Sequence, residues 1–189
     1  MQTRFTLAVI YGSAREGRFC DTIVDWLLSQ LPDMLAVDIV IIDPAEFGTG
    51  SRMERAAVEH RFARDLSHAD AFLIVTPEYN HGYPAALKEL IDSYYRPWAE
   101  KPVAFISYGG VSGGLRAVEQ LRQVFAELGA ATIRETVSFP HASECFDAQG
   151  RLLEPERTGR QLRKLAAQLS WWARTLKLGR ETVALGEVA

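Results

Sequence analysis

The sequence predicts an α/β protein built on a doubly wound, five-stranded parallel sheet with helices on both faces. Short apolar segments alternate with longer amphipathic segments along the 189 residues, which is the pattern of a parallel sheet. One segment, Ala71–Val75, is apolar without interruption, as expected of a strand buried on both faces. Connections are short except at Asp43–Ser51 and Pro140–Glu154. We therefore expect one domain over residues 1–178, followed by a tail at 179–189.

The composition narrows the functional classes. Hydrophobic residues make up 48% and charged residues 24% of the chain, which is ordinary for a water-soluble domain with a core. The net charge of −3 argues against a nucleic-acid partner, which would require clustered Lys and Arg. No apolar run approaches the roughly 20 residues of a membrane span. The short N-terminal apolar stretch ends in a glycine turn, so it predicts a strand rather than a signal peptide.

The two cysteines, Cys20 and Cys145, lie far apart in the sequence. They form neither a disulfide framework nor a metal-binding motif. Reduced thiols of this kind are typical of cytosolic proteins, so we expect a cytoplasmic protein without a metal site.

The first half of the domain contains two strands and two helices. The apolar run Phe5–Tyr11 predicts the first strand. Helical spacing of five apolar residues predicts a helix over Asp21–Leu31. Val37–Ile42 predicts the second strand, and a charged helix with a thin apolar face follows at about Met53–Ser67.

The central part of the sequence continues the alternation of strands and helices. Ala71–Val75 is the third predicted strand, and a helix follows over Ala85–Tyr95. Val103–Ser107 is the fourth strand. The apolar spacing from Leu115 to Leu128 predicts the next helix, for which Gly129 is a suitable C-cap.

The last elements are a strand at Ala131–Phe139 and a long helix at Pro155–Leu178. The helix carries a stripe of leucines and Trp172. The tail Gly179–Ala189 lacks helical and strand periodicity, so we expect it to be loose or to take part in a subunit contact.

The loop Gly12–Arg18 follows the first strand and precedes a helix, which is the usual phosphate position of doubly wound folds. Ser13 offers a hydroxyl, and Arg15 and Arg18 offer guanidinium groups that match phosphate oxygens. The loop has neither the dinucleotide fingerprint nor the P-loop motif. A single monophosphate therefore fits better, and the alternative is a surface turn with solvated arginines.

Two more loops have ligand-binding character. After the third strand, Tyr79 and His81 are suited to line a flat ring, and Asn80 can both donate and accept hydrogen bonds. We expect Glu78 to lie on the surface, and His81 is equally well explained as an exposed loop residue. After the fourth strand, glycines in Ser107–Gly114 allow a ligand to approach the backbone. A strand order of 2-1-3-4-5 would bring these loops and the first one together.

The motifs together resemble a known family. Gly12-Ser13-x-Arg15-x-Gly17-Arg18, Thr76-Pro77-Glu78-Tyr79-Asn80-His81-Gly82-Tyr83-Pro84-Ala85 and Ser107-Tyr108-Gly109-Gly110 are similar to motifs of the NADPH-dependent FMN reductases. This family includes NAD(P)H:quinone reductases, chromate-reducing enzymes and azoreductase-like proteins. The resemblance extends from about Phe5 to Phe139. Many members have serine and asparagine in place of Arg18 and Cys20, and another loop in place of Pro44–Gly50.

The resemblance implies a flavodoxin-like fold that binds FMN without a covalent link. The FMN phosphate would be surrounded by Ser13, Arg15, Arg18, Phe19 and Cys20. The isoalloxazine ring would meet Pro77, Glu78, Tyr79, Asn80 and His81. The other edge of the ring would be closed by Ser107, Tyr108, Gly109 and Gly110.

The resemblance also implies an activity. NADPH or NADH would pass a hydride to FMN, and the acceptor would be a quinone, a free flavin, an azo compound or a metal oxyanion. No residue is assigned as catalytic, and proton donation by His81 or Tyr83 stays open. A homodimer or homotetramer is implied, with Tyr83, Tyr94, Tyr95 and Trp98 as interface residues. The alternatives are a flavodoxin-like electron carrier and a flavin-binding redox sensor.

Overall fold

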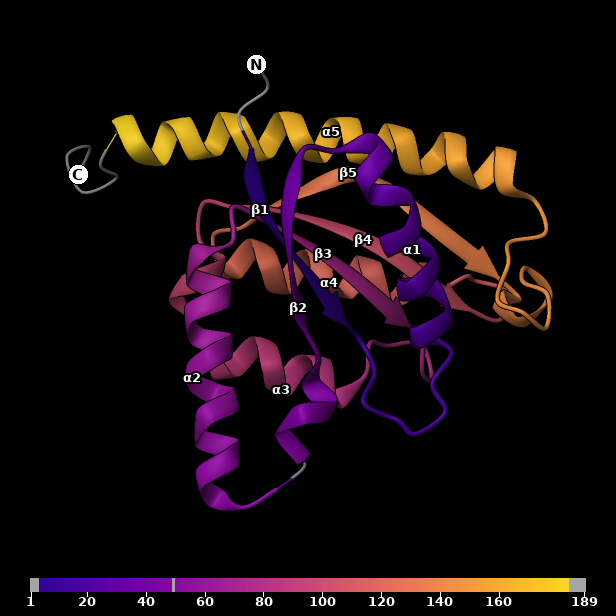
Figure 1. Ribbon diagram of the computed structural model, residues 1–189, viewed down its shortest axis with the longest axis horizontal. Coiled ribbons are helices and arrows are strands. Elements are labelled where there is room, and N and C mark those ends of the chain that lie inside the picture. The colour runs from indigo at the N-terminus through magenta and orange to yellow at the C-terminus, as the bar shows by residue number, and fades with distance from the viewer. Residues whose placement is uncertain (1–3, 49, 184–189) are drawn as a thin grey trace.

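A computed structural model describes residues 4–48 and 50–183. It contains a five-stranded parallel sheet with the strand order β2-β1-β3-β4-β5 (Figure 1). The predicted fold class and strand order are therefore confirmed. The strands are β1 (Phe5–Tyr11), β2 (Val37–Ile42), β3 (Ala71–Pro77), β4 (Pro102–Gly109) and β5 (Ala131–Pro140).

Five α-helices and three 3₁₀ turns connect the strands among the described residues. The helices are α1 (Cys20–Met34), α2 (Arg52–His68), α3 (Ala85–Ser93), α4 (Leu115–Glu127) and α5 (Pro155–Thr182). The turns are η1 (Pro44–Gly48), η2 (Arg96–Trp98) and η3 (Ala142–Glu144).

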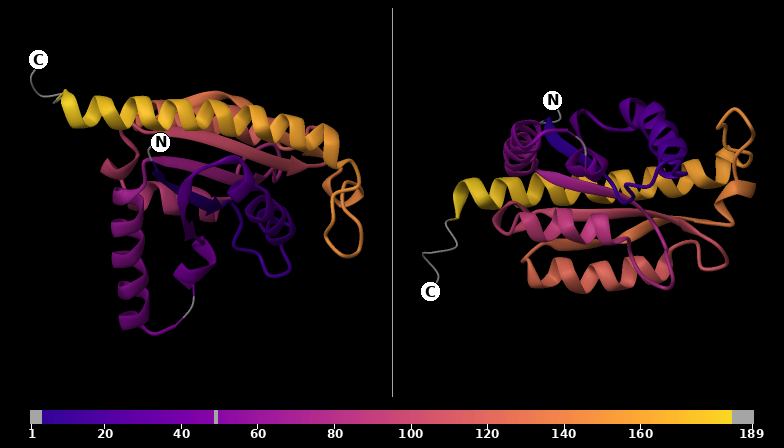
Figure 2. Two further views of the ribbon diagram at one scale, coloured as in Figure 1. Left: turned by 45° about the horizontal axis from the view of Figure 1, so that its top comes forward. Right: turned by 90° about the horizontal axis from the view of Figure 1, so that it is seen from below.

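The helices cover both faces of the sheet. The apolar sides of α1 and α5 pack on one face, and those of α2, α3 and α4 pack on the other. Figure 2 shows α5 lying along the sheet for most of its length. All seven residues of the central strand β3 are buried, as its unbroken apolar sequence predicts.

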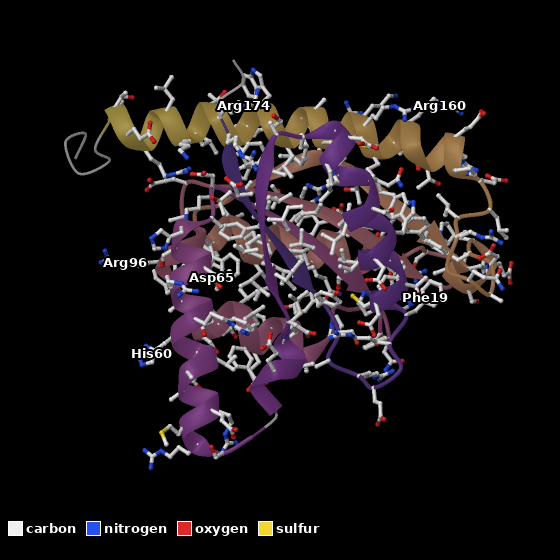
Figure 3. The ribbon with its side chains drawn as sticks, viewed as in Figure 1. Phe19, His60, Asp65, Arg96, Arg160 and Arg174 are labelled. Carbon is white, nitrogen blue, oxygen red and sulfur yellow. The ribbon has the colours of Figure 1, made fainter. Side chains whose placement is uncertain are left out.

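Helix α2 buries fewer residues than any other α-helix of the described chain. Its buried residues are Phe62 and Leu66, near its C-terminal end. His60, which the sequence pattern included in the apolar face, is exposed on the outer side of the helix (Figure 3). A capping box formed by Ser51 and Glu54 stabilises the N-terminus of the helix, which compensates in part for its small apolar contact.

The central strands are longer than predicted. In β3 the pairing continues to Pro77, which lies opposite Tyr108 of β4. Pairing between the two strands thus extends both of them beyond their apolar cores. It carries Pro77 and Tyr108 to the end of the sheet where the strands have their carboxyl termini. The predicted end of α4 is confirmed, because Gly129 has a φ of +70° and the Ala130 N–H donates to the Phe125 carbonyl at 2.9 Å, as in a Schellman motif.

The prediction that the last helix ends at Leu178 is wrong, because α5 continues to Thr182. Arg180 donates to the Glu100 carbonyl at 2.8 Å and to Asp70 Oδ1 at 3.1 Å. Lys177 donates to Asp70 Oδ2 at 2.8 Å. These bonds join the end of α5 to residues just before β3 and β4. They offset the cost of placing Gly179 inside a helix, which is about 1 kcal/mol. The part of the predicted tail at 184–189 lies outside the described residues.

None of the helices within residues 4–48 and 50–183 is long and apolar enough to cross a membrane.

Candidate functional site

The loops after β1, β3 and β4 meet at the carboxyl edge of the sheet, where parallel folds of this order bind ligands. The Gly12 N–H donates to the Val75 carbonyl at 2.7 Å, and the Glu78 N–H donates to the Tyr108 carbonyl at 3.0 Å. The Ser13 and Tyr79 hydroxyls are 3.0 Å apart. The predicted convergence of the three loops is therefore a feature of the structure.

The loop after β1 begins with a close backbone contact. A Cβ atom on Gly12 would lie 2.6 Å from the Val75 carbonyl oxygen and 2.7 Å from Thr76 Cα. Since neither backbone atom can move without displacing β3, this position requires glycine. The contact sets the direction in which the chain leaves the sheet.

The same loop leaves hydrogen-bond donors free. The N–H groups of Glu16, Gly17 and Phe19 donate to no acceptor among the described residues. They precede α1, whose positive dipole end also favours an anion. Ser13 Oγ is buried beside them. The loop therefore has the donor set that a phosphate group needs.

Arg15 and Arg18 lie in different surroundings. Arg15 is exposed, and its guanidinium carbon lies 3.9 Å from the centre of the Tyr79 ring. It pairs with no carboxylate among the described residues, so its charge is available to an anion.

Arg18 is occupied by protein groups. Its side chain is 9% exposed and donates to Asp43 Oδ1 at 2.7 Å, Asp43 Oδ2 at 2.5 Å and Asp21 Oδ1 at 2.8 Å. It also donates to the Ser13 carbonyl and lies over the Tyr11 ring. Hydrogen bonding to Asp43 raises the pKa of Arg18. Arg18 thus ties the loop to the end of β2.

Phe19, Cys20 and the Tyr108 side chain form the floor beneath this loop. Phe19 contacts the Tyr108 ring at a centroid distance of 6.2 Å, and Figure 3 shows it at the beginning of α1. The Cys20 thiol is fully buried and donates to the Val75 carbonyl at 3.3 Å. Burial raises its pKa to about 11, so it is a packing group with little thiolate character.

The Tyr108 phenol is also buried, next to Cys20. Its hydroxyl has no hydrogen-bond partner of standard geometry among the described residues. Burial, reinforced by the neighbouring Cys20, raises the pKa of this phenol. The Tyr108 ring thus contacts Phe19, and its hydroxyl lies near Cys20 and Tyr79.

The loop after β3 is a tight hairpin. Tyr79 and Gly82 exchange two backbone hydrogen bonds, at 2.9 and 3.1 Å. Asn80 and His81 between them have φ values of +50° and +69°, the left-handed pair of a type I′ turn. Both side chains are exposed, so the hairpin presents them at the edge of the sheet.

The expectation that Glu78 lies on the surface is wrong. Its side chain is 7% exposed and accepts hydrogen bonds from Ser112 and Arg116. The burial arises because Ser112 and Arg116 cover the carboxylate from the neighbouring loop and the beginning of α4.

The loop after β4 is thin and is bonded to β4 and β5. Ser107 Oγ and Ser138 Oγ each donate to the Gly113 carbonyl at 2.8 Å. A Cβ atom on Gly113 would lie 2.2 Å from Ser138 Oγ, and its φ is +60°. The open part of the loop is Gly110, where an added Cβ would meet nothing within 4 Å. A flat ligand can approach the backbone there.

The residues predicted for a subunit contact separate into buried and exposed positions. Trp98 is fully buried, and its ring packs at a tilt against Phe72 at 4.7 Å and edge-to-face against Phe125 at 5.4 Å. Its assignment to an interface is wrong, because it fills the core beneath α4. Tyr94 is half-buried and donates to the Glu59 carbonyl at 3.0 Å. Tyr95 is 71% exposed.

Motif reasoning did not identify Asp43, Ser112, Arg116 or Gln120 as residues of this edge. Ser112 lies inside the glycine-rich segment Ser107–Gly114, but its hydroxyl was not singled out there. Arg116 and Gln120 lie in no repeated or glycine-rich pattern that carries a chemical meaning. For Asp43 the available signal was its position as a charged residue directly after a predicted strand.

Cavities of about 290, 410 and 580 Å³ lie elsewhere in the molecule. The largest lies between α2 and α3 and is lined by Arg52, Arg55, Glu59 and Glu89, among other residues. We locate the candidate site where the three loops meet. The free N–H groups of the first loop, Arg15 without a carboxylate partner among the described residues, and the open backbone at Gly110 lie together there.

Comparison with known proteins shows the family to which the chain is similar. Residues 5–144 match the family model of the NADPH-dependent FMN reductases. An NAD(P)H-dependent FMN reductase of Schizosaccharomyces pombe is 32% identical over 147 residues, which cover 71% of this chain and 73% of that protein. A Pseudomonas putida quinone reductase is 31% identical over 167 residues, covering 83% and 89% of the two chains.

Solved structures support the fold. The flavoenzyme FerB, an NAD(P)H:acceptor oxidoreductase of Paracoccus denitrificans, superposes with a TM-score of 0.73 at 23% identity, covering 90% of this chain and 98% of its own. An archaeal flavodoxin superposes with a TM-score of 0.57 at 12% identity, covering 89% and 99%. At these identities the likeness shows a flavodoxin-like fold. With the match over residues 5–144, this chain belongs to the NADPH-dependent FMN reductase family.

Proposed function

We propose that this protein is an FMN-dependent NAD(P)H oxidoreductase that reduces quinones. The observation that carries the proposal is the donor set of the loop after β1. Free N–H groups and Arg15, which has no carboxylate partner among the described residues, lie together before the start of α1. Family membership over residues 5–144 supports the same cofactor.

The residues at the edge fit FMN by their chemistry. Ser13, Arg15 and the free N–H groups of the first loop would hold a monophosphate. The hairpin after β3 and the thin backbone at Gly109–Gly110 would hold the two sides of a flat ring. Pro77 ends β3 beside this hairpin. FMN, when bound, supplies the chemistry of accepting and releasing a hydride.

The other predicted site residues have supporting tasks in this proposal. Arg18 holds the first loop to Asp43, and Phe19, Cys20 and the Tyr108 ring form its floor. Ser107 stabilises the loop after β4 by bonding to Gly113. No side chain is assigned as a catalytic group, because positioning of the cofactor is sufficient for hydride transfer.

The acceptor is proposed as a quinone because relatives at 30–31% identity are named quinone reductases. A free flavin, an azo compound and a metal oxyanion are the competing acceptors. We further propose a cytoplasmic homodimer or homotetramer. Support comes from the exposed Tyr95 beside η2 and from the free thiols of Cys20 and Cys145.

Anaerobic rapid-mixing spectroscopy tests the function. The purified protein should show bound flavin absorbance, NADPH or NADH should bleach it, and a quinone should restore it fastest among the four acceptor classes. Failure of both nicotinamides to bleach the flavin would remove the reductase function. Bound flavin that accepts electrons only from a partner protein would favour a flavodoxin-like carrier instead.

A further inference from the structure

The Glu78 carboxylate connects two loops of the candidate site. Its Oε2 atom accepts from Ser112 Oγ at 2.7 Å and from the Arg116 N–H at 3.1 Å. Its Oε1 atom accepts from Arg116 Nη1 at 2.7 Å. All three donors belong to the loop after β4 or to the beginning of α4, whereas Glu78 follows β3. We call this set of three residues the carboxylate clasp.

The clasp also replaces a missing helix cap. The N-cap position of α4 is Gly114, which has no side chain to accept from the first turn. The first N–H groups of a helix have no partner within the helix, and the Glu78 carboxylate accepts one of them, from Arg116. A negative charge at this position is also favoured by the helix dipole. Helix α4 therefore obtains its cap from another loop.

A second bond holds the same two segments one helical turn further along. Gln120 Nε2 donates to the His81 carbonyl at 2.9 Å. His81 and Asn80 both have positive φ values. Asparagine tolerates this left-handed conformation, whereas it costs roughly 1 kcal/mol or more for a residue such as His81. Such a hairpin persists when surrounding contacts hold it in place. Arg116 and Gln120 supply those contacts from one face of α4.

Burial distinguishes the clasp from an ordinary surface ion pair. The Glu78 side chain is 7% exposed, although that of Arg116 is 49% exposed. Burial by itself would raise the pKa of Glu78, but the hydrogen bonds from Ser112 and Arg116 outweigh it and hold the pKa below its ordinary value. The carboxylate is therefore ionised at neutral pH and has its lone pairs directed at α4 rather than at the open edge.

We infer that Glu78 is a positioning residue for the flavin ring, which acts through the carboxylate clasp and does not itself contact the flavin. The clasp fixes the separation between the hairpin Tyr79–Gly82 and the loop Gly110–Gly114, so both sides of the ring site are assembled before the ligand arrives. This inference rests on the proposed function. Preorganised loops lose less conformational freedom on binding, and the benefit appears as affinity.

A double-mutant cycle tests the inference through flavin binding rather than turnover. Glu78→Gln keeps the size of the side chain but replaces one acceptor oxygen with an amide donor that faces the donors of Arg116. Arg116→Gln removes the cation. Dissociation constants for FMN and riboflavin are measured by fluorescence titration of the full chain after its flavin has been removed by dialysis.

We expect each single variant to bind FMN and riboflavin about tenfold more weakly, which is the scale of one buried charged hydrogen bond. The double variant should be no weaker than the single variants, because both substitutions break one unit. Glu119→Gln is the matched control. Glu119 lies on the same helix, and its side chain is 74% exposed, so the variant should bind both flavins as the wild type does.

Three results would overturn the inference. Unchanged flavin affinity in a folded Glu78→Gln protein with a lowered melting temperature would reduce the clasp to a stabilising contact. Additive losses in the double variant would separate Glu78 from Arg116. Loss of FMN affinity without loss of riboflavin affinity would assign Glu78 to the phosphate. A wild-type protein that binds neither flavin would remove the proposed function, a result distinct from these three.

Discussion

The loop after β1 and the loops after β3 and β4 share one edge of the sheet, but their polar groups are used differently. In the first loop, Glu16, Gly17 and Phe19 retain free N–H groups, and Arg15 has no carboxylate partner among the described residues. In the other two loops, the hairpin backbone is paired and the Gly113 carbonyl accepts two serine hydroxyls.

The difference follows from what each side has to bind. A phosphate is recognised by donors that remain unsatisfied until it arrives, so the protein must leave them free. A flat ring is recognised chiefly by shape, so its walls gain from being bonded in advance. The first loop is therefore held by neighbouring strands, through the bond of Gly12 to Val75 and that of Arg18 to Asp43, while the ring-side loops hold each other.

Gly12→Ala tests whether the first loop depends on a single backbone contact. The added Cβ would overlap the Val75 carbonyl and Thr76 Cα, and overpacking of this kind costs about 1–3 kcal/mol. We expect a fall of several degrees in melting temperature and a loss of FMN affinity of up to about 100-fold. Calorimetry and flavin titration measure both.

Gly179→Ala is the control for that substitution. An added Cβ on Gly179 meets nothing within 4 Å, and alanine is a better helix former than glycine. This variant should be as stable as the wild type or slightly more so. A Gly12→Ala protein with unchanged flavin affinity would show that the loop adapts to displacement.

Arg15→Gln separates the two sides of the site most directly. Loss of a hydrogen bond to a charged group costs about 1.5–3 kcal/mol, so FMN should bind roughly 30-fold more weakly. Riboflavin, which lacks the phosphate, should bind as before. Arg134→Gln, at an exposed position on β5, is the control. Equal losses for FMN and riboflavin would place Arg15 at the ring instead.

Asp43→Asn tests whether Arg18 acts through β2. The substitution removes the charge that Arg18 contacts at 2.5 Å, and we expect FMN affinity to fall by about tenfold. Combining it with Arg18→Gln should add little, because the two residues form one contact. If Arg18→Gln weakened FMN binding while Asp43→Asn left it unchanged, Arg18 would be a direct phosphate ligand.

Acidification should abolish the stabilising effect of the carboxylate clasp. The pKa of Glu78 is lowered from its ordinary value of 4.5. A lowered folded-state pKa stabilises the fold above the unfolded-state value, and the contribution disappears as the pH falls through the folded-state value. The melting temperatures of wild type and Glu78→Gln should thus differ at pH 7 and approach each other well below pH 4.5. A difference that persists in acid would exclude the charge as its cause.

The course of the chain through the sheet follows from local pattern. The alternation of apolar runs and helical spacing predicts five strands and five helices in a parallel sheet, and the strand order agrees with the flavodoxin-like fold that the family resemblance implies. The same pattern brings Gly12, Tyr79 and Gly110 to one edge. The boundaries of the helices and strands were predicted less accurately than their order. The extension of α5 to Thr182 depends on Asp70, more than 100 residues away in the sequence.

The use of each polar side chain at that edge was decided by the tertiary structure. Arg15 and Arg18 are the same residue type in one loop, yet Asp43, 25 residues from Arg18, pairs with Arg18, whereas Arg15 lies over the Tyr79 ring and has no carboxylate partner among the described residues. Glu78 is buried by Arg116, which lies 38 residues further along the chain. Local sequence determines which groups reach the edge. Whether they stay free for a ligand depends on partners that only folding brings within hydrogen-bond distance.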